Sequence, residues 1–427
     1  MKKKKLNLLY NADFLRFGTK KDSHRSGIYY TALNLLKEFV KKDNIDITLF
    51  TMKNYEKDVK KLLKEQFPDI KFKLLIFKNI PAKANIDNLA YICSSDRNFV
   101  LKYIEKLFIY LHYFINKLFM KLYLKIISLN NFDVSFSAKL TLFDKQNELR
   151  VKNRYTFLHD VIPLLYPHYF KEINEHWFED LVSTINEKDY YFTNSEYTRK
   201  DFLKHVPVTN PEKIISTYVG CNVLYNVKKG DLERVKIKYN IPDDKKYVFS
   251  LCSLEPRKNL IRTVQTFIEF TKKHNINDLI LVMGGGNWKS FINKLNNTIK
   301  DLNTDKIIQI GYVDDEDLPV LYSGAEWFTY TSEYEGFGSP VLEAMTCGCP
   351  VITSNNSSLP EVVGNAGITI DYDSDEQHIE AYEKYYFDEN LRKENSKKGL
   401  ERSKLFSWEK TADKMLDIMM KNNELYH

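Results

Sequence analysis

The alternation of strand-like and helix-like segments along the chain most constrains what it can fold into. Apolar runs bounded by turn residues indicate strands in the first half at residues 5–10, 45–51, 71–77, 133–137, 154–159 and 189–194. The second half repeats the pattern at residues 247–251, 279–283, 306–310, 326–331, 351–354 and 368–370. Strands that alternate with helices form parallel sheets covered on both faces. A chain of 427 residues is also too long to fold around a single hydrophobic core. We therefore expect an α/β protein with two doubly wound domains.

Turn residues mark the boundary between the two halves. Four of them lie between residues 206 and 230: Pro207, Pro211, Gly220 and Gly230. A last helix begins near Ser407, a good N-cap, and an apolar stripe runs along it: Ala412, Met415, Leu416 and Met419. We predict an N-terminal domain over residues 1–210, a C-terminal domain over residues 211–405 and a final helix over residues 406–427.

The positions of the basic residues say more about binding partners than the net charge does. Lysine and arginine number 63 against 57 aspartates and glutamates, an excess too mild to indicate nucleic acid. Basic residues gather at positions 2–5 and within residues 98–130, which favours an anionic membrane surface. Five cysteines without paired spacing fit a reducing compartment, and residues 6–10 read as a strand rather than a signal peptide. We expect a cytoplasmic protein, with peripheral attachment to the inner face of the cell membrane as an open alternative.

Residues 98–130 form a basic amphipathic segment with two interpretations. Its apolar stripe has a helical period: Val100, Ile104, Leu107, Leu111, Phe114, Leu118, Leu122 and Ile126. Lysines recur at helical spacing too: Lys102, Lys106, Lys117, Lys121 and Lys125. Its longest uncharged run is far shorter than the ~20 residues that span a bilayer. The segment either lies on an anionic surface, or packs on its own domain with a solvated lysine face.

Residues 333–350 join a glycine-rich turn to the start of a helix. Ser339 is a good N-cap, and Pro340 suits the first helical position. The helix should end at Gly348, before Pro350. This places one glutamate of the stretch in the turn and a second one turn inside the helix.

These two glutamates are Glu335 and Glu343, and their side chains accept hydrogen bonds from hydroxyls. Gly336 and Gly338 let the backbone approach a ligand closely. The N–H groups at Val341 and the residue after it offer an anion site at the positive end of the helix. The arrangement predicts a site for a sugar attached to a phosphate.

A resemblance to a known family follows from this stretch. The two glutamates are separated by seven residues that include Gly336-Phe337-Gly338, and Pro350-Val-Ile-Thr-Ser354 and Leu359-Pro-Glu-Val-Val-Gly364 come after them. The pattern resembles the donor-binding signature of family-4 retaining glycosyltransferases, which have the GT-B fold. Ser339 departs from it, because the family more often has leucine there. The resemblance implies two Rossmann-like domains facing a central cleft, with the last helix crossing back to the first domain.

The resemblance also implies roles for individual residues. It places the nucleotide-sugar donor against Gly336, Phe337, Gly338, Val341 and Glu343, with the sugar hydroxyls on Glu335. Backbone groups near Val313 would read the nucleotide base, although the residues alone show only a strand end there.

Two strand ends in the first half have a structural and a functional interpretation. Gly27 closes a polar loop at the carboxyl end of the first strand, where open α/β sheets bind ligands, and it is either a turn glycine or a phosphate contact. His159 ends a later strand; a lone histidine is usually structural, and Asp160 can simply cap the next turn. His159-Asp160-x-Ile-Pro163 resembles the segment of family members that use GDP-mannose, whose histidine approaches the donor. In the family, a glycine in the first loop faces donor and acceptor.

A basic pair follows the first strand of the second half, within residues 253–260. Arg257 offers a planar charged fork and Lys258 a point charge, which together suit a diphosphate. The alternative is a solvated helix start, but positive charge there opposes the helix dipole unless an anion binds. The family has arginine and lysine at this place. The triple glycine at residues 284–286 lacks phosphate-loop spacing and is predicted to be a flexible turn.

Together with these features, the resemblance implies a retaining glycosyltransferase that moves a hexose, best taken as mannose from GDP-mannose, to a hydroxyl of a glycan or lipid-linked glycan in surface-polysaccharide synthesis. Its predicted catalytic residues are Glu335, His159, Arg257 and Lys258. No Asp-x-Asp motif lies in a suitable place, so we expect no metal and no cofactor besides the nucleotide sugar. The alternatives are a phosphorylase or sugar-nucleotide epimerase of the same fold, and a membrane-associated binding module with weak or lost turnover.

Overall fold

The chain divides into two compact units, residues 1–156 with 417–427, and residues 157–416. A computed structural model describes residues 5–19, 27–77, 132–139, 151–170, 182–206, 210–222, 230–286 and 289–424, with Leu111, Leu118 and Phe178. The basic segment at residues 98–130 lies outside these residues except for Leu111 and Leu118. The second unit begins earlier than the predicted boundary at residue 210. Side chains of residues 195–198 bond to the loop at Gly336, which ties this part of the chain to the C-terminal half.

The first parallel sheet has the strand order β3-β2-β1-β4-β5-β6-β7. The strands are β1 (Leu6–Asn11), β2 (Ile45–Met52), β3 (Lys73–Phe77), β4 (Val134–Ser137), β5 (Asn153–Leu158), β6 (Tyr190–Thr193) and β7 (Ile214–Ser216). The described helices among them are α1 (Gly27–Phe39), α2 (Glu56–Gln66), α5 (Ile162–Leu165) and α7 (Glu196–His205). The division between the two units falls inside β5. The six strands predicted in this half are confirmed.

Strand β7 was not predicted, because its three residues fall in the segment assigned to a crossing between lobes. It pairs in parallel with β6, with Ile214 opposite Tyr191. The pairing continues one residue further, where the Thr217 N–H donates to the Thr193 carbonyl at 2.9 Å. A strand this short carries too few side chains for a period-two pattern to be visible.

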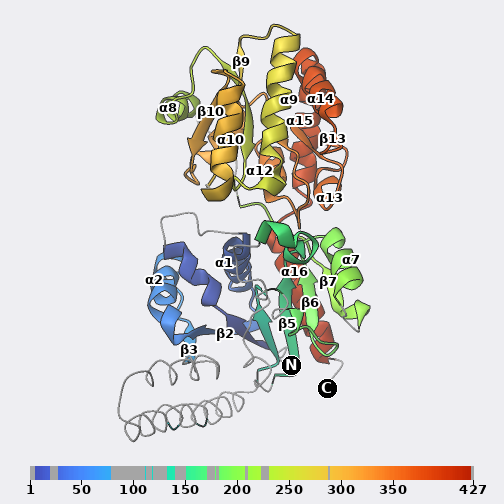
Figure 1. Cartoon of the computed structure of the whole chain (residues 1–427). Coiled ribbons are helices and arrows are strands. Elements are labelled where there is room, and N and C mark those ends of the chain that lie inside the picture. Colours follow the sequence, from blue (N-terminus) through green and yellow to red (C-terminus); the bar gives the residue numbers. More distant parts are fainter. Residues whose placement is uncertain are drawn as a thin grey trace, which may run out of the picture. The chain divides into compact units, whose positions relative to one another are not determined.

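The second parallel sheet has the order β10-β9-β8-β11-β12-β13. The strands are β8 (Lys246–Leu251), β9 (Leu279–Gly284), β10 (Ile307–Gly311), β11 (Trp327–Tyr330), β12 (Val351–Ser354) and β13 (Gly367–Ile370). The helices are α8 (Asp231–Lys238), α9 (Leu260–Lys273), α10 (Lys289–Asp301), α11 (Leu318–Gly324), α12 (Ser339–Thr346), α13 (Leu359–Val363), α14 (Asp375–Phe387) and α15 (Glu389–Ser403). The last helix, α16 (Trp408–Glu424), continues into the first unit, which includes residues 417–427. Figure 1 shows α9, α14 and α15 along this sheet. The six strands predicted here are confirmed.

The strand order places a ligand-binding edge at the centre of the second sheet. Every residue of β9, β11 and β12 is buried, as expected for parallel strands covered on both faces. The order reverses between β8 and β11, which pair directly, Trp327 with Val248. Open α/β sheets bind ligands at the carboxyl ends of the strands where the order reverses. The loops after β8 and β11 therefore meet at the position expected for a ligand.

Two predicted helix starts have different outcomes. Helix α16 begins as expected, because the Ser407 hydroxyl accepts the Lys410 N–H at 3.1 Å. Helix α12 was predicted to be capped by the Ser339 side chain, and this is wrong. Gly338 occupies the cap with φ +94°, and Ser339 is already the first helical residue. Glycine takes this left-handed backbone conformation at little cost, whereas serine does not.

The described residues contain no helix that is long and apolar enough to cross a membrane.

Candidate active site

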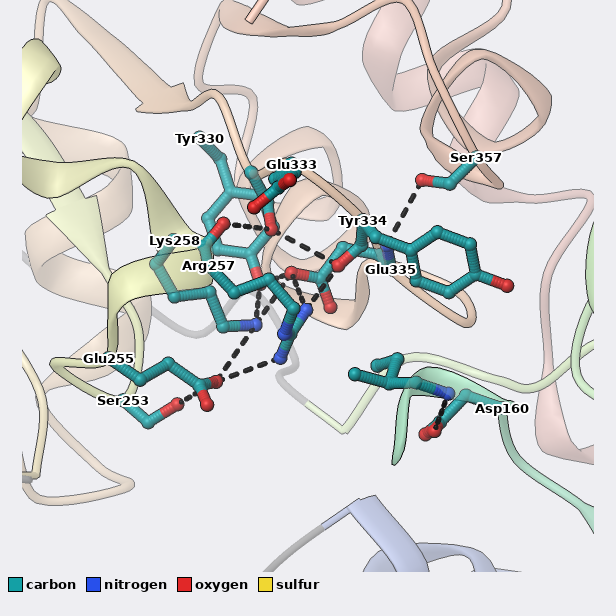
Figure 2. Close-up of polar contacts among 12 residues, drawn as sticks. Asp160, Ser253, Glu255, Arg257, Lys258, Tyr330, Glu333, Tyr334, Glu335 and Ser357 are labelled. Atoms are coloured by element: carbon teal, nitrogen blue, oxygen red, sulfur yellow. Dashed lines mark hydrogen bonds and ion pairs between the residues drawn. The ribbon is translucent and has the colours of Figure 1, made fainter. Parts of the chain in front are cut away.

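The loops after β8 and β11 bring four charged side chains together (Figure 2). Glu255, Arg257 and Lys258 come from the loop after β8, and Glu335 comes from the loop after β11. Pro256 starts a single 3₁₀ turn, Pro256–Lys258, which places the two basic residues side by side. The backbone of the second loop holds this turn in place, since the Arg257 carbonyl accepts the N–H of Glu333 at 2.9 Å.

These four residues, here called the charge cluster, are buried and paired. Lys258 Nζ lies 2.6 Å from Glu335 Oε1, and Arg257 Nη1 lies 3.0 Å from the same oxygen. Arg257 Nη2 lies 2.8 Å from Glu255 Oε1, which is also 3.8 Å from Lys258 Nζ. Each residue is only 7% to 8% exposed. Two cations and two carboxylates balance, so the cluster is neutral in the absence of a ligand.

Electrostatics hold two members of the cluster, Glu335 and Arg257, in their ionised forms. Burial acts to raise the pKa of Glu335, but the Arg257 guanidinium and the Lys258 ammonium outweigh it and lower the pKa to about 2. Burial also opposes the charge on Arg257, and the carboxylates of Glu335 and Glu255 reverse this and raise its pKa. Removing one member of such a buried pair typically costs about 3–5 kcal/mol, because a charge is left uncompensated.

Part of the donor capacity of the cluster remains unused by the protein. Within the described part of the chain, the buried Nε of Arg257 has no hydrogen-bond acceptor. Lys258, Arg257 and the Tyr330 hydroxyl all reach the same oxygen of Glu335, Oε1. Buried polar groups in native proteins are nearly always paired, so an unpaired guanidinium N–H at a ligand-binding edge is consistent with an anionic ligand.

Glu255 and Tyr330 are site residues that the sequence interpretation missed. The Glu255 carboxylate accepts from Arg257 and from the Ser253 hydroxyl at 2.8 Å. The Tyr330 hydroxyl lies 2.8 Å from Lys258 Nζ and 2.9 Å from Glu335 Oε1. Glu255 stands two residues from Arg257, and this spacing was the available signal. Tyr330 is the last residue of an apolar strand, where nothing in the pattern distinguishes it from core.

The glycine turn packs directly against the segment that contains His159. A Cβ at Gly336 would stand 2.3 Å from the His159 carbonyl and 3.0 Å from Asp160 Cβ, so only glycine fits. The Gly336 carbonyl accepts from Ser195 Oγ at 2.6 Å and from Thr198 Oγ1 at 2.9 Å. Asp160 caps the next turn, which was the structural alternative for it, because its Oδ1 accepts the Ile162 N–H at 3.0 Å.

Asp160 lies close enough to the charge cluster to feel its field. Burial raises the pKa of Asp160, while Arg257 and Lys258 act to lower it. His159 and Asp160 follow β5 of the first sheet, and they pack against the glycine turn that follows Glu335 in the loop after β11 of the second sheet. The catalytic role of His159 stays a prediction.

The start of α12 differs from the predicted anion site. The N–H groups of Val341 and Leu342 were expected to be free, but both are directed at the Gly338 carbonyl, at 3.0 and 3.4 Å. The tight turn at Gly338 bends the chain so that this carbonyl caps the first helical turn. The positive end of the helix dipole still lies beside the glycine turn, since α12 starts at Ser339.

Glu343 occupies a separate buried position one turn into α12. Its Oε2 accepts from the Tyr322 hydroxyl at 3.1 Å, and the residue is 8% exposed. Burial raises the pKa of Glu343 from an ordinary value of 4.5 to about 7, and the tyrosine bond only partly opposes this. The two glutamates of the motif are therefore electrostatically opposite. Glu335 is fully ionised at neutral pH, whereas Glu343 is near its midpoint.

The raised pKa of Glu343 predicts a loss of stability as pH rises. Between pH 4.5 and about 7 the folded state binds a proton that the unfolded state has released, so the free energy of unfolding falls across this window. The loss at pH 8 is roughly 2 to 3 kcal/mol. Glu343→Gln should remove this pH-dependent loss of unfolding free energy, so the variant should be more stable than the wild type at pH 8 but not at pH 4.5. Urea unfolding at both pH values measures the difference; equal pH dependence in the two proteins would contradict the assignment.

The remaining predicted residues lie as follows. Phe337 is buried, with its ring 5.7 Å from that of Phe406 in an edge-on contact. Val313 is buried beside Gly284, where a Cβ would stand 2.9 Å from Val313 Cγ2. Gly27 lies in the other compact unit, as the first residue of α1, and a Cβ there would meet open space. The donor contacts predicted for these residues stay predictions.

The triple glycine at residues 284–286 supports the charge cluster. A Cβ at Gly285 would stand 1.6 Å from the Cys252 carbonyl. The Gly286 carbonyl accepts the Leu254 N–H at 2.9 Å, and the Gly285 N–H donates to the Gly311 carbonyl at 2.7 Å. These glycines permit close packing of the loop that carries Glu255 and Arg257, whereas the predicted flexibility of the turn stays a prediction.

Known proteins are similar to this chain in sequence or in architecture. The family model described as glycosyl transferases group 1 matches residues 231–402. O-antigen chain mannosyltransferase B of Escherichia coli is 31% identical over 267 residues, which cover 61% of this chain and 68% of that protein. The serotype-specific mannosyltransferase WbdA of Escherichia coli is 27% identical over 269 residues, which cover 60% of this chain and 32% of WbdA.

Among solved structures, Alr3699/HepE from Anabaena, determined in complex with UDP and glucose, matches with a TM-score of 0.68 at 15% identity. The match covers 97% of this chain and 100% of HepE. This likeness and the two parallel sheets confirm the predicted fold. The chain belongs to the glycosyl transferases group 1 family and has the GT-B fold.

Proposed function

We propose that this glycosyltransferase moves a mannosyl residue from GDP-mannose, with retention of configuration, to a hydroxyl of a glycan or glycolipid in surface-polysaccharide synthesis. The observation that carries the proposal is the buried charge cluster, where Glu335 meets Arg257 and Lys258 at the reversal of strand order. The choice of mannose and of a polysaccharide acceptor rests on the names of two relatives, mannosyltransferases of Escherichia coli.

The cluster suits departure of a nucleoside diphosphate. As the bond to the sugar breaks, negative charge grows on the leaving phosphate, and preorganised cations in a buried site stabilise it strongly. Arg257 has five N–H donors and Lys258 three, more than the contacts to Glu335, Glu255, Tyr330 and the Tyr334 carbonyl use. The diphosphate would take the remaining donors without displacing Glu335.

Glu335 is suited to orient the sugar. Three donors hold its Oε1, and its low pKa keeps it a carboxylate, so Oε2 can accept bonds from sugar hydroxyls. In a front-face reaction the acceptor hydroxyl attacks from the side of the leaving group, and a donor phosphate oxygen takes its proton. This route needs no nucleophile from the protein and gives retention.

The proposal assigns the positive charge in the site to two side chains rather than to a metal ion. Among the described residues, no group of three or more His, Cys, Asp and Glu side chains is placed to hold a metal.

We further propose that residues 98–130 draw the enzyme to an anionic membrane surface, because their lysines share one side of a helical period.

A donor screen tests the function. The full chain should transfer mannose from GDP-mannose to octyl α-mannoside, and the NMR spectrum of the product should show the α anomer, as in the donor. UDP-glucose and UDP-N-acetylglucosamine serve as comparison donors. Transfer from a UDP-sugar but not from GDP-mannose would refute the mannose assignment, and a β product would refute retention and make Asp160 the candidate base.

A further inference from the structure

An aromatic cluster adjoins the charge cluster within the second compact unit. Its members, here called the tyrosine platform, are Tyr166, His168, Tyr169, Tyr197 and Tyr334. The rings of Tyr166 and Tyr169 are stacked with centroids 5.9 Å apart, and His168 lies 4.1 Å from Tyr169. Tyr334 contacts Tyr166 at 5.7 Å and Tyr197 at 6.1 Å. Five rings from three separate chain segments therefore form one continuous set.

The platform is open to solvent on one side, which distinguishes it from core packing. Tyr334 is buried at its base, 4% exposed, whereas Tyr197 is 38% exposed. His168 is exposed too, and Tyr166 and Tyr169 are half-buried. Single exposed apolar residues are normal on a protein surface, but a contiguous set of exposed rings marks a binding surface.

Carboxylates border the rings. The Tyr169 hydroxyl donates to Glu333 Oε2 at 2.6 Å, and the Tyr334 hydroxyl donates to Asp201 Oδ2. These acidic groups disfavour an anionic ligand and accept hydrogen bonds from hydroxyls. Flat apolar faces combined with a few fixed hydrogen-bond acceptors match a pyranose, which has C–H groups on its faces and hydroxyls around its edge.

The chain itself connects the platform to the charge cluster. Glu333 and Tyr334 directly precede Glu335, and Figure 2 shows all three in the same loop. Arg257 Nη1 donates to the Tyr334 carbonyl, and the Arg257 carbonyl accepts the Glu333 N–H. A sugar on the platform would thus lie at the margin of the site where the donor sugar is expected.

We propose that the tyrosine platform is the acceptor subsite, and that it binds a neutral pyranose of the acceptor glycan. The inference rests on the proposed function in one respect, that the acceptor is a glycan. Tyr197 and Tyr166 would pack against the sugar, while the Tyr169 hydroxyl and Glu333 fix its hydroxyls. Acceptor recognition then depends on residues that make no contact with the nucleotide.

Direct binding tests this subsite without turnover. Saturation-transfer NMR of the full chain with α-linked mannotriose should show binding in the absence of donor. Tyr197→Ala and Tyr166→Ala should each weaken it about tenfold, since an aromatic contact is worth about this factor. Tyr169→Phe keeps the ring but loses the hydrogen bond to Glu333, and it should weaken mannotriose binding less than the alanine variants do. The affinity for GDP, measured by calorimetry, should stay within twofold in all three.

Phe387→Ala is the matched control, because Phe387 is a 62% exposed aromatic at the end of α14, away from the platform. It should bind mannotriose as the wild type does. No binding by the wild type, or equal binding by the wild type and both alanine variants, would overturn the inference. Binding through the platform without transfer from any nucleotide sugar would leave the subsite standing and refute the proposed function instead.

Discussion

Arg257→Ala should slow turnover by about 100- to 1,000-fold, the effect of removing one preorganised group that stabilises charge in a transition state. Arg257 is 7% exposed and joins Glu335, Glu255 and the Tyr334 carbonyl. Its removal takes away half of the positive charge facing the leaving diphosphate. Steady-state kinetics at saturating donor measure the loss in kcat, and circular dichroism checks that the variant is folded.

The alanine variant also leaves two buried carboxylates with one cation, which can lower stability. Arg257→Lys keeps the charge and separates the two effects. A lysine cannot form the planar fork that joins two carboxylates, so we expect a folded protein that is still slowed more than tenfold. Arg262→Ala is the control, because Arg262 pairs with Asp373 and Asp375 on a more exposed surface. Full activity in folded Arg257→Ala would place the diphosphate elsewhere.

Glu335→Gln should lower kcat by about 100-fold while changing donor affinity much less. Charge-assisted bonds to the sugar hydroxyls are lost, and these bonds strengthen as the ring flattens toward the transition state. The substitution also removes the negative charge that two cations share, at 2.6 and 3.0 Å. Steady-state kinetics at varied donor concentration separate the change in turnover from the change in donor affinity, because the loss of a contact made only in the transition state lowers kcat.

Glu343→Gln provides the contrast, since a group that holds an unchanging part of the donor contributes uniform binding. It should mainly raise the KM for donor. Glu326→Gln controls for loss of a carboxylate elsewhere in the same unit, because Glu326 lies just before β11 and pairs with Arg392 at 3.2 Å. The product of the Glu335 and Glu343 variants should keep the donor's anomeric configuration. A covalent glycosyl adduct on Glu335 would contradict its role as a hydrogen-bonding group.

The sequence by itself determined the elements and the candidate motif. Twelve strands were predicted because short apolar runs bounded by turn residues are a local property, which neighbouring residues suffice to define. Glu335, Arg257 and Lys258 were identified because each is a charged residue in a loop between a predicted strand and a predicted helix, and because the family resemblance places donor-binding residues there. The family followed from the spacing of two glutamates around one glycine turn.

Only the tertiary structure decided how these residues interact. Lys258 and Glu335 are 77 positions apart, and they meet because β8 and β11 are neighbours in the sheet. The same pairing recruits Glu255 and Tyr330. The structure also assigned the cap of α12 to Gly338 and the packing of Gly336 to the His159 carbonyl. Long-range contacts depend on strand order and on backbone conformation, and neither leaves a periodic signal in the chain.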